Sequence, residues 1–165
     1  MKKKWKVVIA IIVILTFFLA AIYLVGSYSS GSFGYAQQYQ FNVNKIELIK
    51  AVERFKNENN SFNPPSIYLT RDSLDTYTSN FNVYVYYPNQ NSIVYFFIDN
   101  QDRKTSNINL VSINEGLTNP YYKRVNKDFD REHNLKIKEE FKERVLNKLG
   151  LSYEDKGNGM FIFWK

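Results

Sequence analysis

The chain of 165 residues contains no cysteine and only one histidine, His133. The lack of cysteine excludes disulfide scaffolds, cysteine-ligated zinc sites, iron–sulfur centres, thiol nucleophiles and the acylated cysteine of a lipoprotein. A Ser–His–Asp triad or a histidine-rich metal site would have to use His133. That residue lies between Glu132 and Asn134 in a charged segment, a setting typical of a solvated surface histidine.

Short catalytic motifs are missing as well: there is no His-Glu-x-x-His, no Gly-x-Ser-x-Gly and no phosphate-binding loop. Two pairs of aspartates remain as candidates, Asp72 with Asp75 and Asp99 with Asp102, because glycoside hydrolysis needs two carboxylates. The second pair lacks the ligand series, the central glycine and the terminal glutamate of a calcium loop. Both pairs suit turns and helix caps. We therefore predict no catalytic residue, no cofactor and no metal, and a protein that is not an enzyme.

The excess of positive charge lies at one end of the chain. The formal net charge is +6, from 22 Lys+Arg against 16 Asp+Glu. Four of the lysines are Lys2, Lys3, Lys4 and Lys6, and the first 25 residues contain no acid. Without those four, 18 basic residues stand against 16 acidic ones, a net charge of +2. The basic composition therefore gives little support to nucleic-acid binding.

A predominantly apolar run of 19 residues without a charge, 7–25, follows those lysines. A helix of that length reaches about 28 Å, close to the ~30 Å thickness of the hydrocarbon core. We expect residues 7–25 to form a transmembrane anchor in the lipid bilayer. Because lysine-rich flanks stay in the cytoplasm, residues 1–6 would be a cytoplasmic basic stub. The protein would then be a single-pass protein of the inner membrane with a signal-anchor and an extracytoplasmic C-terminal domain.

Residues 26–34 are rich in Gly and Ser, which predicts a flexible tether. Residues 35–165 then form one extracytoplasmic domain. The competing interpretation is a cleaved signal peptide, because Val25-Gly26-Ser27 is a passable cleavage site. On that interpretation the domain is secreted.

Two helices are predicted in the domain. Asn44 can cap the first, and Glu47 completes a capping box. This helix should cover 45–58, with an apolar side made of Ile46, Ile49, Val52 and Phe55. The second should cover 132–149 and end at Gly150, with an apolar stripe made of Leu135, Phe141, Val145, Leu146 and Leu149.

Segments rich in β-branched and aromatic residues predict strands over 81–87, 92–98, 106–113 and 160–164. A short strand over 67–70 and a turn over 156–159 are also expected. The first three strands form a meander, and the strand at 92–98, apolar on both faces, should be central. The predicted fold class is α+β: a single N-terminal transmembrane helix, then two helices packed on a mainly antiparallel sheet in the order α-β-β-β-α-β.

One surface in this fold is a candidate for binding. Tyr84 and Tyr86 alternate with valines and share one face of the sheet, with Tyr95 nearby on the paired strand. They would form an exposed aromatic platform for a peptide or a sugar. The alternative is that the tyrosines are half-buried and covered by the helices.

These features favour a non-enzymatic protein-interaction module, anchored at the membrane and facing the envelope of a bacterium. Its partner would be another envelope protein, and the domain would be an accessory subunit or an immunity protein that neutralises a toxin. Two alternatives stay open: a cell-wall-directed hydrolase that uses Asp and Glu, and a ligand-binding sensor domain that signals through a partner. The oligomeric state stays open too.

Overall fold

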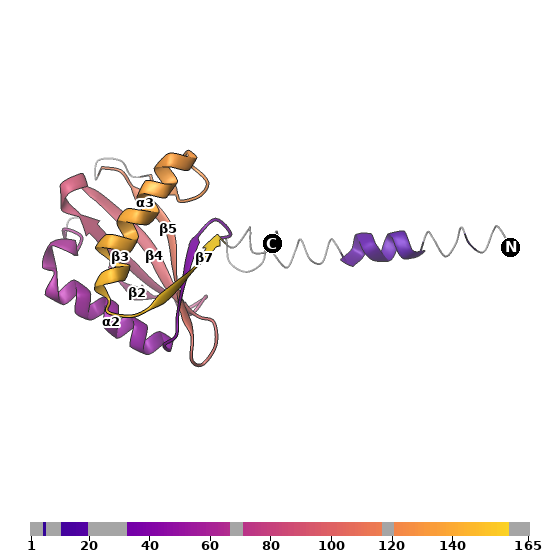
Figure 1. Cartoon of the computed structure of the whole chain (residues 1–165), viewed down its shortest axis with the longest axis horizontal. Helices are drawn as coiled ribbons and strands as arrows, with labels where there is room; N and C mark the ends of the chain where they lie inside the picture. Colours follow the sequence, from indigo (N-terminus) through magenta and orange to yellow (C-terminus); the bar gives the residue numbers. More distant parts are fainter. Residues whose placement is uncertain (1–4, 6–10, 20–32, 67–70, 117–120, 159–165) are drawn as a thin grey trace. The chain divides into compact units, whose positions relative to one another are not determined.

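The computed structural model describes residues 5, 11–19, 33–66, 71–116 and 121–158. The chain divides into two compact units, Met1–Gly34 and Tyr35–Lys165 (Figure 1). A short helix over residues 11–19 belongs to the first unit. The sheet and the two longer helices belong to the second unit.

The predicted transmembrane anchor over 7–25 is wrong. Within the ranges just given, no helix is both long enough and apolar enough to cross a bilayer. The signal-anchor, the single-pass inner-membrane location and the bilayer contact depended on that span and are not retained. Residues 7–10 and 20–25 lie outside the described residues, and secretion after cleavage stays a prediction.

The second unit is α+β, as predicted, and every strand pairing described in it is antiparallel. The sheet has the order β2-β3-β4-β5-β1-β7, and β6 pairs with β5 off this path. Its strands are β1 (Gln37–Phe41), β2 (Ser73–Leu74), β3 (Phe81–Tyr87), β4 (Ser92–Asn100), β5 (Ser106–Asn114), β6 (Lys123–Arg124) and β7 (Tyr153–Asn158).

Two helices, α2 (Lys45–Glu58) and α3 (Arg131–Arg144), cover one face of this sheet. Figure 1 shows α3 running across β3, β4 and β5. The described residues also contain three single-turn 3-10 helices: η1 (Asn60–Phe62), η2 (Pro88–Gln90) and η3 (Leu146–Lys148).

The hydrophobic core lies between the sheet and the two helices. Alternate residues of the strands and one side of each helix form a single buried cluster that includes Val83, Val85, Phe96, Leu110, Leu48, Val52, Phe55, Ile137 and Phe141. Each such side chain contributes roughly 1.5–3 kcal/mol when it is fully buried. Because side chains alternate along a strand, the residues between them point away from α2 and α3. We call that side the outer face; it carries Asn82, Tyr84 and Tyr86 of β3 and Ile93, Tyr95 and Phe97 of β4.

The predicted bounds of the first helix are confirmed, and Asn44 caps it by accepting a hydrogen bond from the Glu47 N–H at 3.0 Å. The predicted apolar side is only partly correct. Ile46 is 67% exposed, whereas Leu48 is fully buried in its place. The side of the helix that packs on the sheet is therefore rotated about the helix axis from the predicted side.

The second helix is shorter than predicted, because α3 ends at Arg144 and η3 follows. Leu135 is 49% exposed, and Ile137 is buried instead. Gly150 has a φ of +69°, a left-handed conformation that glycine adopts at low cost, as expected for the residue after a helix.

The three strands of the predicted meander are confirmed as β3, β4 and β5, and β4 lies between the other two. Strands β1, β2, β6 and β7 were missed. Residues 156–158 belong to β7 and not to a turn, because β7 pairs with β1 across an irregularity next to Gln38 and Tyr39. The predicted strands over 67–70 and 160–164 lie outside the described residues.

Candidate functional site

Tyr84 and Tyr95 are cross-strand partners on the outer face. Their rings stack with centroids 5.0 Å apart and planes 23° apart. Burial raises the pKa of Tyr95 to about 12, with smaller contributions from Tyr84 and Asp75. Burial also raises the pKa of Tyr84, and the Asp72 carboxylate adds to this effect. Both side chains are half-buried, but α2 and α3 lie on the opposite face and do not cover them.

The hydroxyl groups of the three predicted tyrosines differ in their contacts. Tyr95 donates to Asn82 Oδ1 at 3.0 Å, and Tyr86 donates to Asn91 Oδ1 at 2.9 Å. The Tyr84 hydroxyl makes no hydrogen bond with the part of the chain that the structure describes. The sheet thus brings the three predicted residues together and leaves one hydroxyl, that of Tyr84, available to a partner.

The backbone of Tyr84 is fixed by two side chains from outside the sheet. The Tyr84 N–H donates to Asp72 Oδ1 at 3.0 Å, and Lys56 Nζ donates to the Tyr84 carbonyl at 2.9 Å. Lys56 and Asp72 also pair with each other at 2.6 Å. This ion pair occupies the place of a neighbouring strand next to β3, so it satisfies backbone groups that an edge would expose.

The four aspartates of the two candidate pairs bind other groups of the described chain. Asp72 binds Lys56, and Asp75 instead accepts backbone N–H groups in its own turn, which lowers its pKa. Asp102 accepts the backbone N–H groups of Lys104 and Thr105 in the turn between β4 and β5, and these bonds lower its pKa. Burial raises the pKa of Asp99, and the side-chain amides of two asparagines partly oppose this. No group of three or more metal-ligating side chains was found in the described ranges.

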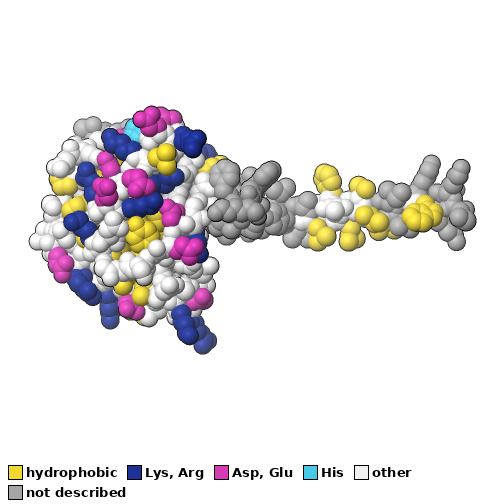
Figure 2. Space-filling model, viewed as in Figure 1, with side chains coloured by type: hydrophobic (Ala, Val, Ile, Leu, Met, Phe, Trp, Pro, Cys, Tyr) yellow, Lys and Arg dark blue, Asp and Glu magenta, His cyan; other side chains and the backbone are white. Residues whose placement is uncertain are grey.

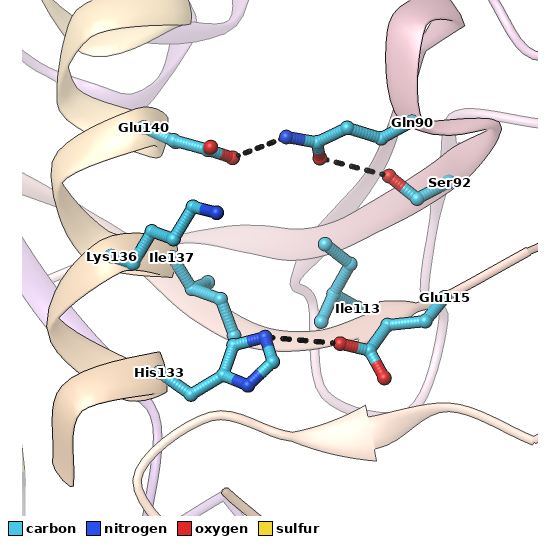
Figure 3. A pocket seen from close by; sticks show the side chains of 8 residues that line it. All are labelled: Gln90, Ser92, Ile113, Glu115, His133, Lys136, Ile137 and Glu140. Atoms are coloured by element: carbon cyan, nitrogen blue, oxygen red, sulfur yellow. Dashed lines mark hydrogen bonds and ion pairs between the residues drawn. The ribbon is translucent and has the colours of Figure 1, made fainter. Parts of the chain in front are cut away.

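Sequence reasoning missed a cleft of about 260 Å³ where the start of β4 and the end of β5 meet α3 (Figure 3). Two buried isoleucines, Ile113 and Ile137, form its apolar part. The other lining residues are polar or charged: Gln90, Ser92, Glu115, His133, Lys136 and Glu140.

His133 lies at one end of this cleft. Its Nε2 is 3.3 Å from Glu115 Oε1, and Glu115 Oε2 pairs with Lys123 Nζ at 2.6 Å. The ring also packs against Phe129, with centroids 5.1 Å apart. His133 is therefore a surface residue, as predicted, since its side chain is 49% exposed. Its pairing with Glu115 was not predicted.

The other end of the cleft carries Glu140, whose Oε2 accepts a hydrogen bond from Gln90 Nε2 at 2.8 Å. Figure 3 shows Ser92 beside Gln90, with Ile113 and Ile137 between this end and His133. Ser92 and His133 therefore do not form the contact between a nucleophile and a base that a triad needs. The two glutamates each bind a different donor rather than facing a common point.

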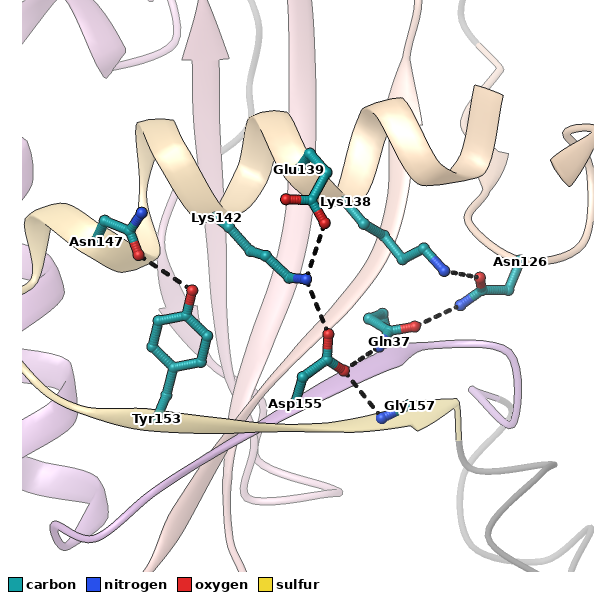
Figure 4. A network of polar contacts seen from close by, with 9 residues as sticks. All are labelled: Gln37, Asn126, Lys138, Glu139, Lys142, Asn147, Tyr153, Asp155 and Gly157. Carbon is teal, nitrogen blue, oxygen red and sulfur yellow. Dashed lines mark hydrogen bonds and ion pairs between the residues drawn. The ribbon is translucent and has the colours of Figure 1, made fainter. Parts of the chain in front are cut away.

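A second polar network joins β1, β7 and α3 (Figure 4). Asp155 pairs with Lys142 at 3.1 Å and accepts hydrogen bonds from Gln37 Nε2 and the Gly157 N–H. Asn126 donates to Gln37 Oε1 at 3.2 Å and accepts from Lys138 Nζ at 3.2 Å. These contacts attach the two last strands of the sheet to α3, which is a structural role.

Arg124, on β6, is paired with an acidic neighbour in the chain. Arg124 binds Asp128 with two nitrogens, at 2.9 and 3.1 Å, and this contact lowers the pKa of Asp128. Figure 2 shows Lys and Arg side chains interspersed with Asp and Glu on the side of the domain that carries α3.

No family model, curated protein or solved structure matches this chain. The proposals that follow therefore depend on the chemistry of its own residues.

Proposed function

We propose that the domain is a non-enzymatic module that binds another protein through the outer face around Tyr84. One observation carries this proposal. Tyr84 stacks on Tyr95 at 5.0 Å, on the side of the sheet away from both helices, and keeps a hydroxyl without a partner in the described structure.

Tyrosines of this kind suit a protein interface. A tyrosine supplies a large contact area and one polar group while it loses few rotamers on binding, and tyrosine is enriched at interfaces. Here the cost of ordering is lower still, because stacking holds both rings and hydrogen bonds hold Tyr86 and Tyr95.

The backbone contacts support the same role. Lys56 and Asp72 hold Tyr84 from the side opposite to β4, so its ring projects from a rigid strand rather than from a loop. A rigid anchor residue of this type often dominates the binding energy of an interface.

The test is capture from an extract of the cells that produce the protein, with the tagged full chain as bait. Tyr84→Ala removes the proposed anchor, and Leu135→Ala is the matched control, because Leu135 is an exposed apolar residue on α3. We expect wild type and Leu135→Ala to capture the same protein, and Tyr84→Ala to bind it about 30-fold more weakly, as for a hot spot of ~2 kcal/mol.

Circular dichroism of each variant would confirm that its fold is intact. If a protein is captured equally by the folded Tyr84→Ala variant, or if wild type captures none, the proposal is overturned.

A further inference from the structure

The cleft between β4, β5 and α3 is lined by an exposed lysine, Lys136, whose ammonium has no partner among the described residues. Lys136 lies one helical turn after Glu132 and one turn before Glu140, and both spacings favour ion pairs. Lys136 nevertheless makes no ion pair or hydrogen bond with the described residues. In Figure 3 its ammonium is turned toward the cleft, between the ends that carry Glu140 and His133.

A buried hydroxyl in the same cleft is poorly satisfied. Ser92 is 2% exposed. Its Oγ is 3.5 Å from Gln90 Oε1. Hydrogen bonds between a hydroxyl and an oxygen are typically about 2.5–3.0 Å long. Ser92 therefore keeps most of its capacity to donate to a ligand.

The cleft also contains a hydrogen-bond acceptor and an apolar surface that a ligand could contact. Gln90 occupies only Oε2 of Glu140, and Oε1 makes no hydrogen bond with the described residues. Ile113 and Ile137 supply apolar surface between the two ends. Within the described residues, the cleft thus offers an unpaired cation, a weakly bonded hydroxyl donor, a carboxylate oxygen without a donor and a hydrophobic contact.

We propose that this cleft binds a free α-amino acid with an apolar side chain. The carboxylate of the ligand would accept hydrogen bonds from Lys136 and Ser92, and its ammonium would bind Glu140. Its side chain would pack on Ile113 and Ile137. The volume of about 260 Å³ suits so small a molecule, since pockets for drug-sized ligands are typically ~300–1,000 Å³.

The charges select this ligand over related ones. A simple anion such as phosphate has no positive group for the Glu140 carboxylate and would be repelled by it. The last residue of a peptide lacks the ammonium group, and the first residue lacks the carboxylate. A free amino acid carries both charges next to one apolar side chain.

The test is a titration of the full chain with L-leucine, N-acetyl-L-leucine and L-leucinamide, followed by NMR of the backbone amides. We expect L-leucine to shift the resonances of Ser92 and Lys136 and to bind at least about tenfold more tightly than either derivative. No shift at millimolar leucine, or equal binding of the three compounds, would overturn the proposal.

Two variants separate the contacts. Lys136→Gln should weaken the binding of L-leucine. The affinity for L-leucinamide should not change, because this compound has no carboxylate for Lys136 to bind. Glu140→Gln should weaken the binding of L-leucine. The affinity for N-acetyl-L-leucine should not change, because this compound has no ammonium group for Glu140 to bind. Lys50→Gln, at an exposed position of α2, is the control and should bind like wild type. If Lys136→Gln and Lys50→Gln bind L-leucine equally, the assignment of the carboxylate site is wrong.

Discussion

Lys56 and Asp72 form an ion pair of 2.6 Å that also binds both backbone groups of Tyr84. The side chain of Lys56 is 9% exposed and that of Asp72 is 22% exposed. A single contact therefore links α2, the segment before β2 and the strand that carries the proposed binding residue.

Removal of the Lys56 side chain should lower the free energy of unfolding. Lys56→Ala leaves Asp72 without its cation and the Tyr84 carbonyl without its donor. Breaking a buried pair typically costs about 3–5 kcal/mol, and because Asp72 is partly hydrated we expect a loss of about 2–3 kcal/mol. Urea denaturation measures it. Lys50→Ala, on an exposed side of the same helix, should change the free energy of unfolding by at most about 0.5 kcal/mol. Equal effects of the two substitutions would contradict the structural role of the pair.

The hydroxyl of Tyr87 is buried and has no hydrogen-bond partner among the described residues, whereas that of Tyr95 donates to Asn82. Tyr87→Phe should therefore leave the free energy of unfolding unchanged or raise it, because an unsatisfied polar group is removed. Tyr95→Phe should lower it by about 0.5–1.5 kcal/mol, the usual contribution of a hydrogen bond. Thermal unfolding of both variants checks this difference. A larger loss for Tyr87→Phe would show that its hydroxyl is bonded.

The raised pKa of Tyr95 has a consequence for alkaline stability. Its pKa is about 12 in the folded protein, above the usual value of 10.0. The folded state therefore holds this proton more tightly than the unfolded state. The resulting stabilisation is complete below pH 10 and is lost as the pH rises toward 12.

We expect the free energy of unfolding of wild type to fall over this pH interval, and that of Tyr95→Phe to fall less steeply. Chemical denaturation at a series of pH values measures both slopes. Identical slopes would contradict the burial of the Tyr95 hydroxyl.

The N-cap of α2 provides a further test of the fold. Asn44→Ala removes the acceptor of the Glu47 N–H and should lower the free energy of unfolding by about 1 kcal/mol. Asn57→Ala, at an exposed position inside the same helix, should have no effect or a slight stabilising one, because alanine has the higher helix propensity. Denaturation with urea distinguishes the two. A cost for Asn57→Ala as large as that for Asn44→Ala would be inconsistent with the capping contact.

Local signals in the sequence were sufficient for the central part of the fold. The cap at Asn44 and the alternating residues of 81–87 predict α2 and β3 because each depends on neighbours in the chain. Strand β1 was missed because it is only five residues long and its first buried position is the polar Gln37, so that only Tyr39 and Phe41 show the alternation. Pairing with β5 and β7 determines that strand, and such long-range contacts leave no local pattern.

Of the proposed binding residues, some were predictable from local sequence and others were not. Alternation along β3 and β4 was enough to place Tyr84, Tyr86 and Tyr95 on one face. Which face α2 and α3 cover was not predictable from a single strand. The cleft could not be found either, because Ser92, Glu115 and Lys136 meet only when the ends of two strands lie beside α3.

The measurement that tests the central claim most directly is site-specific photo-crosslinking inside the producing cells. A photoreactive amino acid would replace Tyr84 in one variant and Leu135 in another, both in the full chain. We expect position 84 to crosslink to one partner protein and position 135, on the opposite side of the sheet, to give no such product. Crosslinking of the same protein from both positions, or no product from position 84, would contradict the assignment of the outer face as the binding surface.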